Sequence, residues 1–374
     1  MENFDFNAEI EKHYNIKRFI IISDTHFGVR SNSVEWMEIQ QDYFYNWFIP
    51  LLKKNFKSGD ALIHTGDVFD SRQSLNLKVM NIALEIFDSI SKIMPVYIIC
   101  GNHDIYHKNT NTVNSLKPFK YIQNIFVYEK PIILEVNNGK TRLLLMPWIE
   151  TKENQQLIID NNSSDYLFCH TDIKGLKFNS YTKIEEGIDI NKVNKFKKVY
   201  SGHIHYTQTI KNIQMVGCPY QLTRGDIGNK KYVWYIDFET DKEIRIENDY
   251  SPKFLRLKLE DVLEMRYGKL KKMFENNFVD ILVNSNSLIS FPFNLFLELF
   301  EDVHYRKINY IIATENDNEI ELDDKDDQEN NELDILNLIN IYIDNLSYKD
   351  NIKNKLKNIS KKIYYKISKE KTEK

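Results

Sequence analysis

Aspartate, histidine and asparagine residues recur between positions 24 and 205 in short clusters that suit metal binding. The clusters have the forms D-x-H, G-D-x-x-D, G-N-H-D, H-x-D and G-H-x-H. Carboxylate, imidazole and amide groups together match two divalent ions of intermediate hardness, such as manganese, iron or zinc. One carboxylate can bridge two ions about 3.5–4 Å apart. The residues concerned are Asp24, His26, Asp67, Asn102, His170, His203 and His205, accompanied by Asp70, His103, Asp104 and Asp172.

Each of these clusters, taken alone, is a weak signal. Short D-x-H and G-D sequences are common in surface turns, whereas G-H-x-H places both imidazoles on one face of a strand. Glycine directly before Asp67, Asn102 and His203 permits left-handed or closely approached backbone at each turn. The joint occurrence of five clusters, in order, favours a centre for two divalent ions over chance.

Each cluster follows a short run of β-branched and aromatic residues that is typical of a buried strand. Segments 33–56 and 74–93 carry apolar residues at helical spacing between the first three strands, which predicts parallel strand–helix–strand pairing. Side chains that follow the carboxyl ends of such strands converge at one edge of the sheet. Later runs, such as TRLLLMPW and KYVWYIDFE, predict further strands. We therefore expect an α/β fold with two packed sheets flanked by helices.

The five clusters, in this order, resemble the motifs of the calcineurin-like metallophosphoesterases. Within that family the chain is most similar to the SbcD-type DNA repair nucleases, including those of T-even phages. The resemblance covers about residues 16–240 and weakens over 254–345. It implies a β-sandwich flanked by helices, a small α/β capping domain and a helical C-terminal tail. The supporting segments are GDVFDSR at 66–72, GNHDIYHKN at 101–109, MPWIETKEN at 146–154, VYSGHIHYTQ at 199–208 and VGCPYQLTRGD at 216–226.

The resemblance also implies a role for each residue at a matching position. His103 would stabilise the transition state at the scissile phosphate or protonate the leaving oxygen, with Asp104 orienting its imidazole. Archaeal members have a histidine where this chain has Asp70, so Asp70 either tunes His103 or caps the following helix. The first metal would be held by Asp24, His26, Asp67 and His205, and the second by Asp67, Asn102, His170 and His203.

Other residues near the motifs have two interpretations each. Arg30, Arg72, Lys108 and Arg224 follow motif loops, and they are either contacts for DNA phosphates or exposed loop residues. Trp148 and Tyr220 either support the site or stack on bases. His64, inside a predicted strand, is expected to be a packed histidine with a hydrogen-bonded neighbour.

A domain boundary is predicted near Asn248–Pro252, where proline follows a polar cluster. The resulting division is a nuclease domain over 1–250, a capping domain over 251–314, an acidic linker over 315–331 and a helical tail over 332–374. Residues 315–334 contain eleven acidic residues and one lysine, whereas residues 345–374 contain ten lysines and three acidic residues. By resemblance, the capping domain would orient DNA and the tail would bind a coiled-coil ATPase of the SbcC type. The alternatives are a dimerisation module and a helix packed on its own domain.

The composition excludes a strongly basic DNA-coating protein, because 50 basic and 54 acidic residues leave a net charge of −4. Three scattered cysteines are too few for a disulfide framework and favour reduced thiols. No apolar run reaches the ~18 residues that a membrane helix needs, and the polar N-terminus differs from a signal peptide. We expect a cytoplasmic location in a bacterium or virus-infected cell, or a nuclear one if the host is eukaryotic.

The predicted function is a metal-dependent DNA exonuclease and endonuclease subunit acting on double- and single-stranded DNA. Its cofactors would be two divalent ions, manganese first, with magnesium, iron or zinc also compatible. It would form a homodimer within a heterotetramer that includes the ATPase. The alternative is a phosphatase of the same superfamily, although protein phosphatases usually show G-D-x-x-D-R-G and G-N-H-E. A third hypothesis, a non-catalytic scaffold, would predict lost ligands, and none is lost here.

Overall fold

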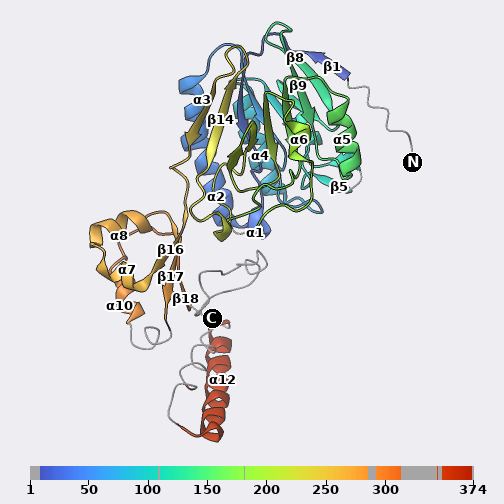
Figure 1. Ribbon diagram of the computed structural model, residues 1–374. Coiled ribbons are helices and arrows are strands. Elements are labelled where there is room, and N and C mark those ends of the chain that lie inside the picture. Colours follow the sequence, from blue (N-terminus) through green and yellow to red (C-terminus); the bar gives the residue numbers. More distant parts are fainter. Residues whose placement is uncertain are drawn as a thin grey trace. The chain divides into compact units, whose positions relative to one another are not determined.

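The structure is a computed structural model, and it describes residues 9–107, 110–180, 182–284, 292–312, 343 and 348–372. The chain divides into two compact units, Met1–Pro252 and Lys253–Lys374 (Figure 1). The first unit contains every predicted metal ligand, so its architecture decides how the site is built.

A six-stranded sheet of the first unit carries three of the predicted clusters. Its strands lie in the order β15-β14-β2-β3-β4-β7. β2, β3, β4 and β7 are parallel, so the carboxyl ends of β2, β3 and β4 meet at one edge. β14 is antiparallel to β2 and to β15. The bounds are β2 Arg18–Ile22, β3 Asp60–His64, β4 Val96–Ile99, β7 Ile125–Tyr128, β14 Tyr232–Asp237 and β15 Glu243–Glu247.

A seven-stranded sheet carries the two remaining clusters, in the order β1-β8-β9-β10-β11-β13-β12. β9, β10, β11 and β13 are parallel, which brings the ends of β10 and β11 together. A separate hairpin, β5 (Ile105–His107) with β6 (Thr110–Asn114), follows the G-N-H-D motif. The bounds are β1 Glu9–Lys12, β8 Ile132–Val136, β9 Thr141–Met146, β10 Tyr166–His170, β11 Lys198–Gly202, β12 Gln208–Ile210 and β13 Ile213–Met215.

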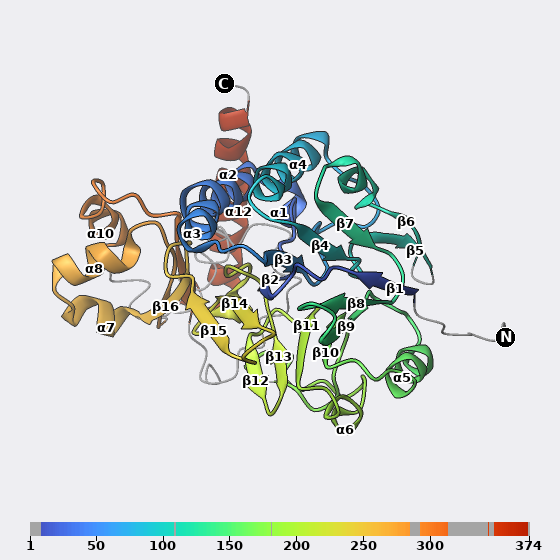
Figure 2. The ribbon, with the colours of Figure 1, turned by 90° about the horizontal axis from the view of Figure 1, so that it is seen from above.

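Helices cover the outer face of each sheet, which gives four layers in the first unit (Figure 2). On the six-stranded sheet lie α2 (Val34–Asp42), the π-helix η1 (Tyr43–Phe48), α3 (Ile49–Asn55) and α4 (Leu77–Ser91). On the seven-stranded sheet lie α5 (Lys152–Asp160) and α6 (Ile190–Val193). The fold prediction of two sheets flanked by helices is thereby confirmed. Short helical turns complete the unit: α1 Val29–Asn32, η2 Lys117–Tyr121 and η3 Arg224–Asp226.

The core between the two sheets is aromatic. Phe168 of β10 stacks on Tyr200 of β11 with ring centroids 5.2 Å apart, and it meets Phe19 of β2 edge to face at 5.4 Å. Trp234 of β14 is fully buried in the same cluster. Close-packed aromatic rings leave little freedom for either sheet to shift. The relative position of the strand ends, and therefore of the ligands, is set by this core.

The second unit contains a three-stranded parallel sheet in the order β16-β17-β18. Two helices, not one continuous helix, lie between β16 and β17, because the chain is extended at Met265 and Arg266. The predicted acidic linker and the start of the tail, 332–342, lie outside the described residues. The bounds are β16 Phe254–Lys258, α7 Leu259–Glu264, α8 Tyr267–Phe274, β17 Phe278–Val283, α10 Phe293–Glu298, β18 Lys307–Ile312 and α12 Asp350–Thr372.

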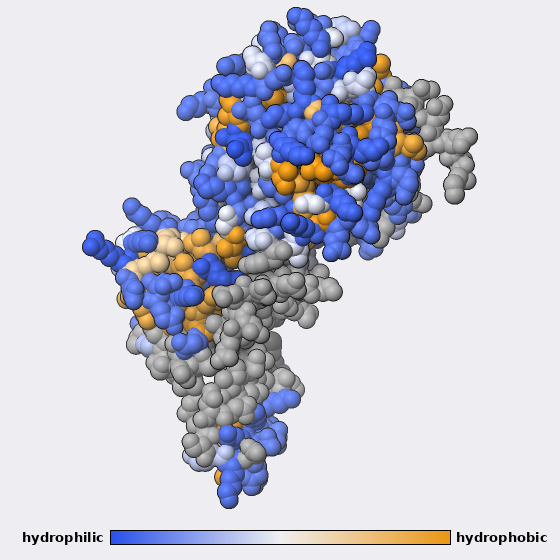
Figure 3. Space-filling view, in the orientation of Figure 1, coloured by the Kyte–Doolittle hydropathy of each residue, from blue (hydrophilic) through white to orange (hydrophobic). Residues whose placement is uncertain are grey.

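The visible surface of the first unit is mainly hydrophilic, with small hydrophobic patches (Figure 3). None of the helices in the described residues combines the length and the hydropathy required to cross a bilayer.

Candidate metal centre and active site

The loops that carry the candidate ligands adopt backbone conformations that ordinary residues avoid. The φ angles of Asp24, His26, Asp67 and His203 are 51°, 45°, 56° and 85°. Left-handed backbone costs a non-glycine residue on the order of 1–3 kcal/mol and clusters at functional sites. The close-packed turns after β2, β3 and β11 hold these residues in place. Strain at four of the seven predicted ligands is independent support for a functional site.

Glycine is required where the loops cross. A Cβ atom on Gly101 would lie 2.2 Å from Asp67 Oδ1, and one on Gly66 would lie 2.4 Å from His170 Nδ1. Gly66 also has a φ of 102°. Neither position can accept a side chain without displacing a predicted ligand.

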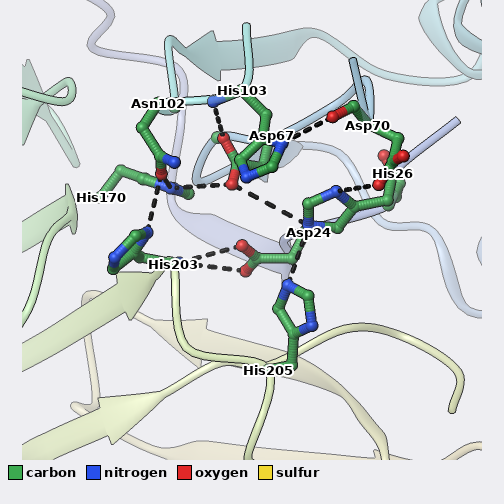
Figure 4. Close-up of polar contacts among 12 residues, drawn as sticks. Asp24, His26, Asp67, Asp70, Asn102, His103, His170, His203 and His205 are labelled. Atoms are coloured by element: carbon green, nitrogen blue, oxygen red, sulfur yellow. Dashed lines mark hydrogen bonds and ion pairs between the residues drawn. The ribbon is translucent and has the colours of Figure 1, made fainter. Parts of the chain in front are cut away.

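One group of candidate ligands forms around His26 (Figure 4). Its Nε2 lies 2.9 Å from Nε2 of His205 and 3.9 Å from Oδ2 of Asp67. The ligand atoms of Asp24, His26 and Asp67 all lie within 4.8 Å of one another. These are the four residues predicted to hold the first metal, and the fold brings them together from β2, β3 and the loop after β11.

A second group forms around Asn102 (Figure 4). Its Oδ1 lies 2.9 Å from His170 Nε2 and 2.7 Å from His203 Nδ1. His170 Nε2 also lies 3.2 Å from Asp67 Oδ2. Asp67 therefore belongs to both groups, with one carboxylate oxygen between His26 and His170.

The donor chemistry of the second group fits a cation. His170 Nδ1 lies 2.7 Å from the carbonyl oxygen of Thr65, which can only accept, so the ring proton is on Nδ1. When the ring carries only that proton, Nε2 directs a lone pair towards oxygens of Asn102 and Asp67. His203 has its outer nitrogen, Nε2, 3.4 Å from Asp172 Oδ2. A histidine that binds a metal typically donates a hydrogen bond from one ring nitrogen to an acceptor and directs the lone pair of its other ring nitrogen at the metal.

The electrostatic field of the site also favours positive charge. Asp24 and Asp67 are almost completely buried. Burial disfavours the charged form of His170, but Asp67 and Asp24 outweigh it and raise its pKa to about 9. Burial acts in the same way on His26, where Asp70 and Asp67 raise the pKa to about 9. A site that draws protons this strongly onto imidazoles attracts divalent cations by the same charges.

His103 lies beside both groups. Its Nδ1 donates to the carbonyl oxygen of Asp70 at 2.6 Å, and its backbone N–H donates to Asp67 Oδ1 at 2.7 Å. Its ring meets that of His26 edge to face at 5.1 Å. Burial lowers the pKa of His103 despite the nearby carboxylate of Asp67. The remaining nitrogen, Nε2, has no hydrogen-bond partner among the described residues and is the atom available to a substrate.

Asp104 has a different environment from the one expected. Its Oδ2 accepts the backbone N–H groups of Asp67 and Gly101, both at 2.9 Å. Its Oδ1 accepts those of Val68 at 3.0 Å and Phe69 at 3.2 Å. The carboxylate thus holds the loop that carries Asp67, while the Asp70 carbonyl oxygen is the group that orients His103.

Residues distant in the sequence hold the loop after β2, which carries Asp24 and His26. Gln40 donates to the carbonyl oxygens of Thr25 and His26 at 2.9 and 3.1 Å, and Tyr220 donates to that of Thr25 at 2.6 Å. Tyr220 therefore supports the site. His64 is buried and hydrogen-bonded to Thr25 Oγ1 at 3.0 Å, and burial lowers its pKa to about 3, so it is a packed neutral histidine.

The predicted DNA-contacting arginines differ in their surroundings. Arg30 donates to the carbonyl oxygen of Leu222 at 3.0 Å and lies over the ring of Trp36, so part of its guanidinium contacts the protein itself. Arg72 and Arg224 are partly exposed. Lys108 lies outside the described residues.

Three residues near the site are not among the seven predicted metal ligands. Asp172 contacts His203, and its only signal was its place two residues after His170. Trp148 lies with its ring 4.9 Å from that of His203. Cys218 is buried, with its sulfur within 4.8 Å of ligand nitrogens of His26 and His205.

Comparison with known proteins gives a consistent result. Residues 17–207 match the family described as calcineurin-like phosphoesterase. Exonuclease subunit 1 of Enterobacteria phage T4 is 28% identical over 236 residues, which cover 62% of this chain and 68% of that protein. Putative phosphoesterase 244L of Invertebrate iridescent virus 6 is 27% identical, covering 56% and 72%. DNA double-strand break repair protein Mre11 of Thermoplasma acidophilum is 32% identical over a shorter stretch, covering 23% of each chain.

Proposed function

Because this chain belongs to the calcineurin-like phosphoesterase family, we propose that it is a two-metal DNA nuclease that hydrolyses phosphodiester bonds. The observation that carries the proposal is the position of Asp67, whose Oδ2 lies 3.9 Å from His26 Nε2 and 3.2 Å from His170 Nε2. One carboxylate between two imidazole groups is the arrangement that a bridging ligand requires. The similarity to a phage exonuclease subunit supports DNA as the substrate.

The proposed ligand sets follow the two groups in the structure. Asp24, His26, Asp67 and His205 hold the first ion, and Asp67, Asn102, His170 and His203 hold the second. Mixed oxygen and nitrogen donors suit manganese, which we propose as the native ion.

The chain's own residues would act on a phosphodiester in three ways. Two divalent ions, when bound, would neutralise the phosphate charge and make a water molecule more acidic. Asp67, which contacts a histidine of each group, fixes the spacing between the two groups. His103 presents Nε2 to the phosphate, where it stabilises developing charge or donates a proton to the leaving oxygen. Asp70 keeps that ring oriented by accepting from Nδ1 at 2.6 Å.

Beyond the site, we propose the organisation that the sequence predicts. The unit with strands β16–β18 acts as a capping domain that orients DNA, and Arg72 and Arg224 contact DNA phosphates. A homodimer joins an SbcC-type coiled-coil ATPase through the helical tail, which includes α12. This helix is lysine-rich and amphipathic, a pattern that suits a docking helix.

The test of the activity is a comparison of substrates. Purified protein is incubated with end-labelled double- and single-stranded DNA, with a chromogenic phosphomonoester, and with no added metal. Manganese-dependent cleavage of DNA is expected, with little turnover of the phosphomonoester. The reverse preference would make the protein a phosphatase and overturn the proposal.

The test of the partner is a truncation before Asp350, which removes α12. Nuclease activity is expected to remain, while co-purification with the ATPase encoded in the same genome is lost. Retained co-purification would place the interface elsewhere.

A further inference from the structure

A cavity of about 240 Å³ opens beside the candidate metal centre in the first unit. Its walls come from the β5–β6 hairpin, the turn before β8, and the segment that joins β9 to α5. The residues that matter for its chemistry are Asn111, Glu129, Trp148, Ile149, Thr151 and Asn154. A volume below the ~300–1,000 Å³ of pockets for drug-sized ligands suits a single small ring system.

Trp148 connects this cavity to the metal centre. Its ring lies 4.9 Å from the ring of His203, inclined by 42°, and 6.2 Å from that of His170. Both histidines belong to the group around Asn102. Trp148 therefore lines the cavity and also contacts a histidine of the second metal group.

The wall is held in place before any ligand arrives. The backbone N–H of Trp148 donates to the carbonyl oxygen of Cys100 at 2.8 Å, which ties the wall to the G-N-H-D loop. Asn111 Nδ2 donates to the carbonyl oxygens of Trp148 and Glu129 at 2.9 and 3.0 Å. Preorganised walls reduce the ordering cost of binding.

The lining favours an uncharged, flat ligand with polar edges. Trp148 and Ile149 supply apolar surface, and Asn154 and Thr151 supply hydrogen-bonding groups. The carboxylate of Glu129 forms an ion pair with Lys120 at 2.8 Å and accepts a hydrogen bond from Asn114 at 2.9 Å, so its negative charge is neutralised. Lys130 and Glu150, which also line the cavity, bring one charge of each sign. The lining therefore has no excess of positive charge to attract a phosphate, whereas a neutral aromatic ring would gain a stacking partner.

We propose that this cavity receives one nucleobase of the DNA strand being cut, stacked on Trp148. The proposal rests on the proposed nuclease function. Bases stack on aromatic side chains irrespective of their identity, and enzymes that work on DNA commonly take a base out of the helix. The closeness of Trp148 to His203 limits the occupant to a base adjoining the scissile phosphate. The cavity would hold the strand in place while the metal centre acts.

The first experiment places a single 2-aminopurine at each position around the cut site of an oligonucleotide, with phosphorothioate linkages that keep the strand intact. Binding to the full-length protein is expected to change the fluorescence strongly at one position next to the scissile bond. Asn154→Trp, which fills the cavity and leaves Trp148 in place, should remove that change. Trp47→Ala is the matched control, because Trp47 packs on Tyr43 in the π-helix away from the cavity.

The second experiment compares oligonucleotides with and without a base at that position. Loss of the base should weaken binding to the unmodified protein by about 5- to 150-fold, the usual range for one stacked base. Trp148→Ala should be insensitive to the missing base, and Trp148→Phe should recover most of the sensitivity. Metal content is measured in each variant, because Trp148 also contacts His203.

Three outcomes are informative. A base effect that is unchanged in Trp148→Ala and Asn154→Trp overturns the cavity assignment. DNA that is bound and cut with no dependence on any single base also overturns it, while the nuclease function stands. Failure to bind DNA at all overturns both proposals.

Discussion

The Nε2 atoms of His26 and His205 lie 2.9 Å apart, although 179 positions separate the two residues. If both rings were neutral with their protons on Nδ1, the two Nε2 lone pairs would face each other and repel at this distance. Either a shared proton or a cation must lie between them. The neighbouring carboxylates of Asp24 and Asp67 supply the negative charge that holds such a cation. This relationship predicts how the protein responds to metal and to substitution at each ligand group.

Asp67→Ala should reduce the metal content from two ions per chain to less than one, because Asp67 serves both groups. Asp24→Ala should remove only the ion of the His26 group. Elemental analysis after gel filtration in manganese measures both, with Asp88→Ala as a surface control. At 100 times the dissociation constant, one bound ion stabilises the fold by ~2.7 kcal/mol, or about 5–10 °C in Tm. Two ions retained by Asp67→Ala would contradict a bridging role.

His103→Ala should keep both ions yet lose most phosphodiester cleavage. A positioned acid or charge stabiliser contributes typically about 10²–10⁴-fold to the rate, and kcat should fall within that range while KM changes little. His107→Ala is the matched control, since His107 is exposed four residues further along in β5. Loss of metal from His103→Ala would show that the imidazole acts as a ligand.

Asp172→Asn should weaken the ion of the Asn102 group by about 10- to 100-fold, the usual effect of removing an acceptor behind a histidine ligand. The carboxylate lies 3.4 Å from His203 Nε2, so its loss lets the ring rotate and lowers its basicity. Isothermal titration with manganese measures the affinity, and Asp160→Asn on α5 serves as control. Equal affinities in the variant and the unmodified protein would remove Asp172 from the site.

Asp104→Ala should lower the free energy of unfolding even in the absence of metal. Four buried backbone N–H groups would lose their acceptor, and each unsatisfied donor costs about 1–3 kcal/mol. Urea denaturation in EDTA measures the change. Asp189→Ala removes a carboxylate that accepts one backbone N–H at the start of α6, and its effect should be clearly smaller. A stable Asp104→Ala protein that fails only in catalysis would restore the role first predicted for it.

The sequence predicted the fold class well because its signals are local. Strands such as β2, β3 and β10 are apolar runs bounded by polar residues, and the candidate ligands lie at or just after their carboxyl ends. Parallel strands of one sheet bring their carboxyl ends to one edge, so the convergence of Asp24 and Asp67 could be inferred from the sequence, whereas His170 joins them from the other sheet. Asp104 was predicted to orient His103 because the two residues are adjacent in the sequence. Its carboxylate instead accepts backbone N–H groups of the loop that carries Asp67.

What the sequence by itself determined was the list of candidate ligands and the order in which the strands present them. Only the tertiary structure decided which acceptor faces which nitrogen. Thr65 and His170 are 105 positions apart, and Asp70 reaches His103 across 33. Contacts of this kind depend on loop geometry and on aromatic packing between two sheets, and hydrogen bonds are lost within about an ångström of misplacement. No local pattern encodes that precision, so the cavity beside Trp148 emerged only from the folded chain.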